Sequence, residues 1–270
     1  MFYLWLGLFG CMTGISAVLF GFGGGFVVVP LLYRLLLGSH DADDAIAQSA
    51  MHIAVATSTC VMIVNALMAT GKHRRAGNLI RHYLWPLGGY IGLGAIAGAV
   101  LAMAVSGEVM RYAFIAYLAL TIADCLLRRG FLEQGDTRAP RRLGRLEYTD
   151  GLGIGAIATF LGVGGSVMTV PLLRRCGLSM TQATSMANPL SVPVALAGTL
   201  TYMALAGFSR FDLGPWFIGY VDLLAFAVLT LGSLLGIRLA TPWIGHIPDR
   251  LHARVYIGLL VLVMLGMLAS

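Results

Sequence analysis

Long apolar runs dominate the sequence, and they constrain its fold more than any other feature. Charged, glycine-rich or proline-containing stretches separate runs at about 2–37, 47–70, 83–105, 109–127, 151–173, 183–206, 216–240 and 255–269. A helix that crosses the hydrocarbon core of a bilayer needs about 20 residues, with a range of about 17–25. Most of the runs have this length, so the sequence predicts an all-α protein that crosses a membrane several times.

The composition agrees with lipid as the main solvent. The 270 residues are 58% hydrophobic and 11% charged, whereas soluble proteins carry about 25% charged residues. The net charge of +6 comes from residues in short loops that form no stripe or groove. This pattern argues against a nucleic-acid partner and makes the lipid bilayer the expected one.

No signature of a hydrolytic or nucleotide-binding enzyme is present. The patterns GxxxxGK[ST], HExxH and GxSxG are absent, and the four cysteines form no CxxC pair. These patterns identify P-loop ATPases, zinc proteases, serine hydrolases and thiolate metal sites. We therefore expect no enzymatic activity, no cofactor and no metal.

The first apolar run is too long to be one straight helix. At about 1.5 Å per residue it would extend roughly 54 Å, against a hydrocarbon core of about 30 Å. The cluster Gly21-Phe22-Gly23-Gly24-Gly25 is the expected break, and Pro30 follows it. The fifth run repeats this design 141 residues later, with Gly162-Val163-Gly164-Gly165-Ser166 and then Pro171.

Other paired motifs extend this similarity to both halves. The chain holds Ala56-Thr57-Ser58 and Ala183-Thr184-Ser185, and the packing motifs Gly94-xxx-Gly98 and Gly232-xxx-Gly236. Features that recur in the same order indicate an internal duplication. We expect a first membrane repeat at 1–130, a linker at 131–148 and a second repeat at 149–270. Each repeat would have a broken first segment, either re-entrant or two short crossings, followed by three transmembrane helices.

Loop charges predict that the two repeats are inverted. An excess of Lys and Arg marks the cytoplasmic side of a membrane protein. Loop 72–81 and the linker are basic, whereas loop 38–46 holds three aspartates. In the second half the counterpart of that acidic loop holds Arg174 and Arg175. The linker is therefore expected in the cytoplasm.

The two glycine clusters are the first candidates for a binding site. Broken membrane segments free backbone groups that lipid cannot satisfy, and in inverted-repeat transporters the resulting helix N-termini hold anions near the midplane. The candidate substrate-binding residues here are Gly23, Gly24, Gly25, Gly164, Gly165 and Ser166. The alternative is that these glycines only allow tight helix packing.

Polar side chains inside apolar runs complete the candidate site. Thr57, Ser58, Thr184, Ser185 and Asn188 could donate hydrogen bonds to a ligand, although hydroxyls in membrane helices also bond the carbonyl four residues earlier. Asn65 is a weaker candidate of the same kind. His52 is either a protonatable coupling group or a polar residue near the outer surface. His73 lies among loop arginines, so we expect it to face solvent or headgroups, and Pro189 and Pro193 are expected to interrupt their helix.

The paired motifs resemble those of the TauE/SafE family of sulfite-exporter-like membrane proteins. The resemblance rests on residues 21–30, on Ala50–Ser58, on His73–Gly77 and on the second copy of the glycine motif at 162–171. It implies a multi-pass permease in the bacterial inner membrane that moves small, sulfur-containing anions. Ala56, Ala183 and Ser166 stand where the family usually has glycine, and this leaves the identity of the anion open.

These observations together predict a secondary transporter of a small anion, such as a sulfur-containing oxyanion or an organosulfonate. Transport would proceed by alternating access around a site between the two glycine breaks. A passive anion channel and a membrane scaffold without transport are the alternatives. Direction, coupling ion and oligomeric state stay open, and a homo-oligomer is compatible with the sequence.

Overall fold

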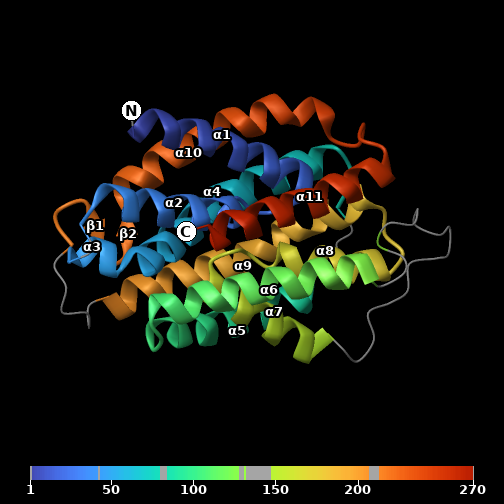
Figure 1. Ribbon diagram of the computed structural model, residues 1–270. Coiled ribbons are helices and arrows are strands. Elements are labelled where there is room, and N and C mark those ends of the chain that lie inside the picture. Colours follow the sequence, from blue (N-terminus) through green and yellow to red (C-terminus); the bar gives the residue numbers. More distant parts are fainter. Residues whose placement is uncertain are drawn as a thin grey trace.

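The structure of the chain is a computed structural model, and it describes residues 2–41, 43–79, 84–127, 131, 147–206 and 213–269. These residues form mostly helices (Figure 1). The elements are α1 (Phe2–Phe20), α2 (Gly25–Ser39), α3 (Ala45–Gln48), α4 (Ala50–Arg75), α5 (Leu87–Met103), α6 (Gly107–Leu127), α7 (Glu147–Leu161), α8 (Ser166–Arg175), α9 (Met180–Ala206), β1 (Phe217–Ile218), β2 (Val221–Asp222), α10 (Leu223–Ala240), η2 (Thr241–Trp243) and α11 (Asp249–Leu268).

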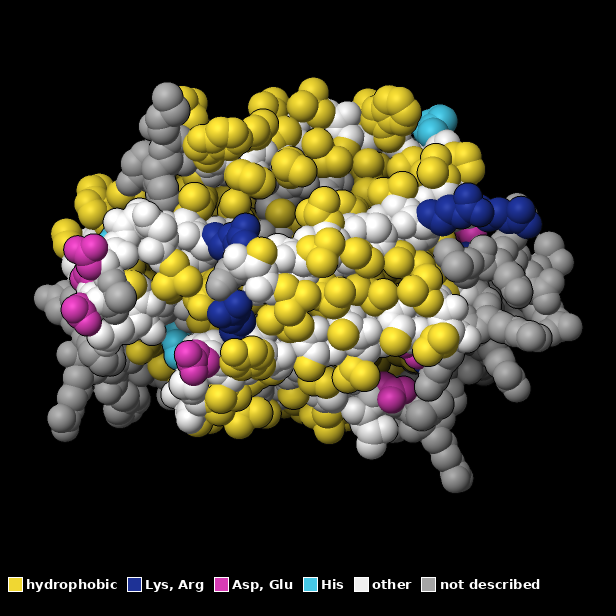
Figure 2. All heavy atoms as spheres, viewed as in Figure 1, with side chains coloured by type: hydrophobic (Ala, Val, Ile, Leu, Met, Phe, Trp, Pro, Cys, Tyr) yellow, Lys and Arg dark blue, Asp and Glu magenta, His cyan; other side chains and the backbone are white. Residues whose placement is uncertain are grey.

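The predicted all-α membrane protein is confirmed. Among the described residues, α4, α6, the stretch Leu223–Trp243 and α11 are long and apolar enough to cross a membrane. Leu120, Leu231 and Leu262 are 72%, 69% and 65% exposed, which suits contact with lipid. Hydrophobic side chains cover most of the middle of the face in Figure 2, and a row of Lys and Arg lies at its right.

Both predicted glycine breaks are present. α1 ends at Phe20 before α2 begins at Gly25, and α7 ends at Leu161 before α8 begins at Ser166. Gly21 and Gly23 have φ of 74° and 62°, and the glycines 141 residues later have φ of 68° and 71°. Side chains avoid this left-handed region, so the backbone of each break requires glycine.

The two halves exchange their first helices. α1 packs along α10, and α7 packs along α5. The predicted packing motifs lie at these contacts. A Cβ at Gly94 or Gly98 would overlap a backbone oxygen of α7, and one at Gly232 or Gly236 would overlap a backbone oxygen of α1. Their role in close helix packing is therefore confirmed.

The helices α4 and α9 pack against each other in the interior, between the two breaks. α9 is continuous from Met180 to Ala206, so the predicted interruption at Pro189 and Pro193 is wrong. In a membrane protein, neighbouring helices and hydroxyl side chains can satisfy the backbone groups that a proline frees.

Two further features differ from the sequence expectation. A short antiparallel pair, β1–β2, precedes α10 at the end of the molecule that also holds α3 and the N-terminus (left in Figure 1). Most of the expected linker 131–148 lies outside the described residues. Phe131 is 5% exposed and its ring lies 5.6 Å from that of Tyr256, so the first residue of this segment belongs to the core.

Candidate functional site

The two glycine breaks meet in the interior of the protein. A Cβ at Gly25 in the first break would overlap the carbonyl oxygen of Gly162 in the second. Gly23 and Gly164 occupy matching places in the two breaks, and both face the sulfur of Met62 on α4. The sequence therefore brings together two segments that are far apart along the chain, as predicted for the glycine clusters.

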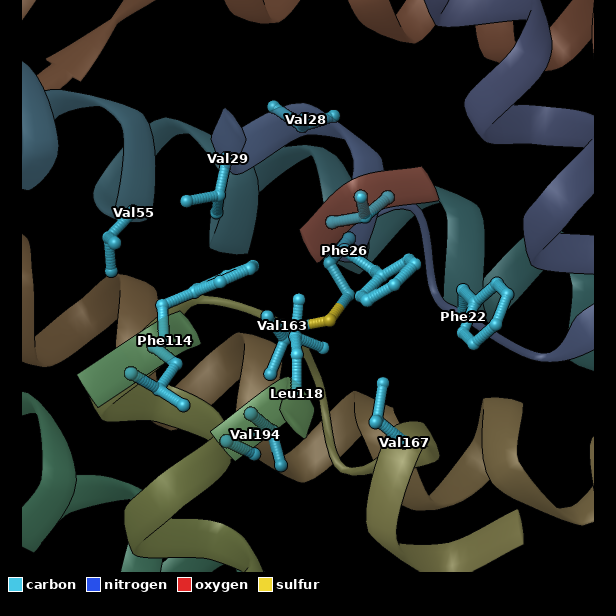
Figure 3. Close-up of a cluster of buried hydrophobic side chains, with 14 of the residues drawn as sticks. Phe22, Phe26, Val28, Val29, Val55, Phe114, Leu118, Val163, Val167 and Val194 are labelled. Atoms are coloured by element: carbon cyan, nitrogen blue, oxygen red, sulfur yellow. The ribbon is translucent and has the colours of Figure 1, made fainter. Parts of the chain in front are cut away.

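The aromatic and aliphatic side chains of the breaks interlock around this contact. Figure 3 shows Phe22 of the first break and Phe26 of α2 near Val163 of the second break and Val167 of α8. The rings of Phe22 and Phe26 stack with centroids 4.5 Å apart, and both are fully buried. The breaks are thus closed to solvent in this conformation.

Two helix N-termini point into this buried region without side-chain caps. The N-cap residues of α2 and α8 are Gly24 and Gly165, and neither can cap through a side chain. The first residues of both helices are buried. The first N–H groups of a helix lack intrahelical partners and carry partial positive charge, so a helix start is suited to an anion.

Asn65 adds an unpaired donor at the first break. Its Oδ1 accepts a hydrogen bond from the Ser233 hydroxyl (2.5 Å), while its buried Nδ2 has no hydrogen-bond partner. A Cβ at Gly24 would overlap that same Nδ2, so the amide lies against the start of α2. A buried amide donor left unpaired costs about 1–3 kcal/mol. A hydrogen-bond acceptor bound beside the break would remove this cost.

Further polar atoms lie on α9 and at the start of α8. Asn188 donates through Nδ2 to the Thr184 carbonyl (3.4 Å), and its buried Oδ1 has no partner. The hydroxyl of Ser166 at the start of α8 is also buried and unpaired. A Cβ at Gly164 would lie 3.3 Å from the Ser191 hydroxyl. Asn188 and Ser166 were candidates from the sequence, whereas Ser191 was not.

The first Thr-Ser pair divides between two places. Ser58 donates towards the carbonyls of Val55 (2.7 Å) and Gly162 (2.9 Å), so its hydroxyl reaches the second break. Thr57 instead accepts from the backbone N–H of Asp222 (3.0 Å). Asp222 caps α10 through Leu224 and Ala225 N–H, and burial raises the pKa of its carboxyl despite these bonds. The Thr57 hydroxyl is therefore directed towards the start of α10 in this conformation.

The second pair lies beside the first break. Thr184 donates to the Met180 carbonyl of its own helix (2.9 Å), and its own carbonyl lies against Gly21. The Ser185 hydroxyl is 3.0 Å from His73 Nδ1 and also bonds the Thr181 carbonyl. Every hydroxyl of the two pairs has a protein partner in this conformation, so none is free to bind an anion without a rearrangement.

His52 forms its hydrogen bonds at the end of α5. Its Nε2 is 3.2 Å from the carbonyl oxygens of both Ala102 and Val105, and its ring lies 5.5 Å from that of Tyr220. It stands 21 residues before His73 on the same helix, which is about 32 Å along the axis at 1.5 Å per residue. Its role as a coupling group stays a prediction.

The expectation for His73 is wrong. Its residue is 1% exposed, and its Nε2 donates to the Val18 carbonyl (2.8 Å). α4 continues as far as Arg75, so the helix carries His73 into the protein between α1 and α9, while Arg74 and Arg75 are exposed. The sequence alone did not reveal this, because the loop was assumed to begin before His73.

The family profile described as "Sulfite exporter TauE/SafE" matches residues 6–267. The chain belongs to the TauE/SafE family. The resemblance carried by the paired glycine motifs is thereby confirmed. A Haemophilus influenzae protein (strain ATCC 51907 / DSM 11121 / KW20 / Rd) named "Probable membrane transporter protein" is 24% identical over 241 residues, which are 89% of this chain and 88% of that relative. No solved structure matches the chain.

These relationships make this TauE/SafE family member a multi-pass membrane transporter, and they point away from an enzyme. Sequence reasoning found the two breaks but missed Met62 and gave little weight to Asn65. Both lie in a run that is apolar on nearly every side, so periodicity cannot tell which face of α4 turns inward. An amide in the middle of such a run was the available signal for Asn65.

Proposed function

We propose that this protein is a secondary transporter of a small anion, either a sulfur-containing oxyanion or an organosulfonate. The observation that carries the proposal is the meeting of two buried, uncapped helix starts at the breaks of α1–α2 and α7–α8. Discontinuous helices of this kind hold anions at their N-termini in transporters built from repeats. The site would include Gly23, Gly24, Gly25, Gly164, Gly165, Ser166, Ser58 and Asn188, with Asn65 added.

The donors at the breaks favour weak and permissive binding. Among the side-chain atoms nearest the glycines of the breaks, the polar and sulfur atoms belong to Met62, Asn65, Ser58 and Ser191, and none of these side chains is charged. Each helix start contributes about 0.3–1 kcal/mol when exposed and up to about 2 kcal/mol when partly buried. Hydrogen bonds to a charged group add about 1.5–3 kcal/mol each. We therefore expect an affinity in the micromolar to millimolar range and modest discrimination among oxyanions.

Met62 provides a means of opening the site. Its sulfur occupies the space that Gly23 and Gly164 share. Methionine is unbranched and flexible, so it can leave that space at lower cost than a branched side chain. An anion that displaces it would gain access to the helix starts and to Asn65 Nδ2.

Alternating access would follow from the paired construction of the chain. α1 packs on α10 and α7 on α5, so each half holds the first helix of the other. Rocking of one repeat against the other around a fixed central site is the usual motion of such transporters. The basic loops would lie in the cytoplasm of a bacterium, with the protein in the inner membrane.

Uptake into proteoliposomes tests the proposal. Purified protein is reconstituted, and the initial uptake of labelled sulfite, thiosulfate, methanesulfonate, sulfate and acetate is compared with that of protein-free vesicles. We expect saturable uptake of the sulfur-containing anions and acceleration by unlabelled anion on the opposite side. A channel would conduct without this counterflow, and a scaffold would show no flux above protein-free vesicles, so either result would overturn the proposal.

A further inference from the structure

Two buried imidazoles hold the end of α1, immediately before the first break. The carbonyls of Val18 and Leu19 accept hydrogen bonds from Nε2 of His73 and of His252, both at 2.8 Å. The preceding carbonyl, of Ala17, accepts from the Gly21 N–H at 3.1 Å. The last carbonyls of a helix have no intrahelical partners. Here the partners are two titratable side chains, His73 and His252, which are 1% and 3% exposed.

The hydrogen bonds around His73 have one hydrogen too few when the ring is neutral. Nε2–H donates to Val18, so Nδ1 of the neutral ring can only accept, and its neighbour is the Ser185 hydroxyl at 3.0 Å. That hydroxyl also points to the Thr181 carbonyl, and it has a single hydrogen. A proton on Nδ1 removes the conflict, because Nδ1–H then donates to Ser185 and Ser185 donates to Thr181.

His252 offers a second place for a proton. Its Nδ1 is buried and has no partner, and its ring meets Phe20 edge-on at 5.1 Å. Beside it lies a cavity of about 10 Å³ that is lined by His73, His252, Thr181 and Thr184, among others. This is close to the volume that one water molecule needs. A water there would connect Nδ1 of His252 with the polar groups around His73.

The charged groups around the pair lie on α8, α11 and α4. α1 presents only carbonyls, and α9 presents the hydroxyls of Thr181, Thr184 and Ser185. Asp249 at the start of α11 pairs with Arg174 of α8 (2.8 Å) and accepts from the Met180 N–H (2.7 Å). On α4, Lys72, Arg74 and Arg75 flank His73 in sequence, and His246 beyond η2 is exposed.

At the corresponding place, the second break has a group that does not titrate near neutral pH. Thr159 stands 141 residues after Val18, and its carbonyl accepts from the Tyr202 hydroxyl at 2.8 Å. A tyrosine hydroxyl has a reference pKa of about 10, whereas that of histidine is about 6.5. The two halves therefore hold equivalent carbonyls with different groups, and only the first half uses one that responds near neutral pH.

We propose that His73 and His252 form a proton-binding site that couples a proton to anion transport through the end of α1. One proton binds at a time, because charge on one ring disfavours charge on its neighbour. The protonated site ties α4, α9 and α1 together through Ser185 and Val18, and the neutral site leaves one of these bonds unmade. The coupling to transport rests on the proposed function, whereas proton binding itself does not.

Trp243 gives a direct readout of proton binding, since it lines the same cavity. The other tryptophans, Trp5, Trp85 and Trp216, are replaced by Phe, and His246 by Gln, in a common background. Protonated imidazole quenches indole fluorescence, so we expect emission to fall as the pH is lowered between about pH 8 and 5. The double variant H73Q/H252Q should lose this transition, and the matched variant His52→Gln should keep it.

Ser185→Ala provides a milder variant in case the double variant does not fold. It removes the acceptor that the protonated Nδ1 of His73 needs, so the midpoint of the Trp243 transition should move to lower pH. Absence of a transition in the background protein would overturn the proposal. A transition that persists in H73Q/H252Q would also overturn it. If the double variant cannot be purified, an unchanged midpoint of the transition in Ser185→Ala would overturn it instead.

Coupling is measured with methanesulfonate, whose charge stays constant across this pH range. A gradient of one pH unit across proteoliposomes should drive accumulation of up to about tenfold if one proton accompanies each anion. His73→Gln and His252→Gln should abolish this accumulation while exchange of labelled for unlabelled methanesulfonate continues. Gradient-independent transport by the unmodified protein, or variants that still accumulate the anion, would overturn the coupling. Complete absence of methanesulfonate movement would instead count against the proposed function, and the fluorescence titration would then decide the proton site alone.

Discussion

Gly164 and Gly165 are adjacent residues of the second break that differ in backbone conformation. Gly164 has φ of 71° and faces the Met62 sulfur, whereas Gly165 has φ of −68° and a Cβ there would meet only ordinary or slightly tight contacts. A side chain in the left-handed region costs about 1–2 kcal/mol. We expect Gly164→Ala to lower initial anion uptake roughly tenfold or more, and Gly165→Ala to stay near the unmodified rate.

The comparison of these two variants is informative because they lie in the same break. Gly153→Ala on α7 serves as a further control, since nothing lies within 4 Å of its Cβ position. Equal loss of transport in Gly164→Ala and Gly165→Ala would mean that the backbone conformation of the break is not what matters.

Asn65 permits a separate test of the donor at the first break. Asn65→Leu removes the unpaired Nδ2, so anion affinity should fall by about tenfold or more, as expected for a lost hydrogen bond to a charged group. Thermal stability should change little, because an unsatisfied buried donor disappears as well. Ser233→Ala removes the partner of Oδ1 and keeps Nδ2. If Ser233→Ala weakens binding as much as Asn65→Leu, the amide donor has no special role.

At the level of helices, the packing motifs fix how the two halves hold each other. The backbone of α7 passes directly over Gly98, whereas Gly258 on α11 has no atom within 4 Å of its Cβ position. Overpacking of a close contact costs about 1–3 kcal/mol. We expect Gly98→Val to lower the midpoint of thermal unfolding in detergent and Gly258→Val to leave it unchanged. Equal stability of the two variants would contradict the close contact between α5 and α7.

The elements that the sequence predicted are those with strong local causes. The glycine clusters identified both breaks, because left-handed backbone conformations require glycine. The length of the first apolar run also predicted the first break. The two prolines of α9 led to a wrong prediction of a helix interruption, because packing inside the protein keeps that helix intact. The β1–β2 pair was not predicted, since two-residue strands leave no periodic pattern. His73 and Met62 depended on helix phase, which apolar runs do not reveal.

For the whole molecule, the loop charges predict which end faces the cytoplasm. In a cysteine-free background, single cysteines at Asp43, Arg74 and Arg175 are treated in intact cells with a reagent that cannot cross the membrane. All three positions are exposed. Asp43→Cys should react, whereas Arg74→Cys and Arg175→Cys should react only after the cells are opened. Reaction of Arg175→Cys from outside would show that the two repeats are not inverted.

The central claim is that an anion binds where the two breaks meet and displaces Met62. Met62→Cys in a background without Cys11, Cys60, Cys125 and Cys176 places one thiol at that point. Its rate of modification by a sulfonate-bearing methanethiosulfonate reagent is measured in proteoliposomes with increasing sulfite or methanesulfonate. The account predicts that a transported anion slows modification, with half-maximal protection near the concentration that half-saturates uptake. Transport of an anion that leaves the modification rate of Met62→Cys unchanged would contradict it.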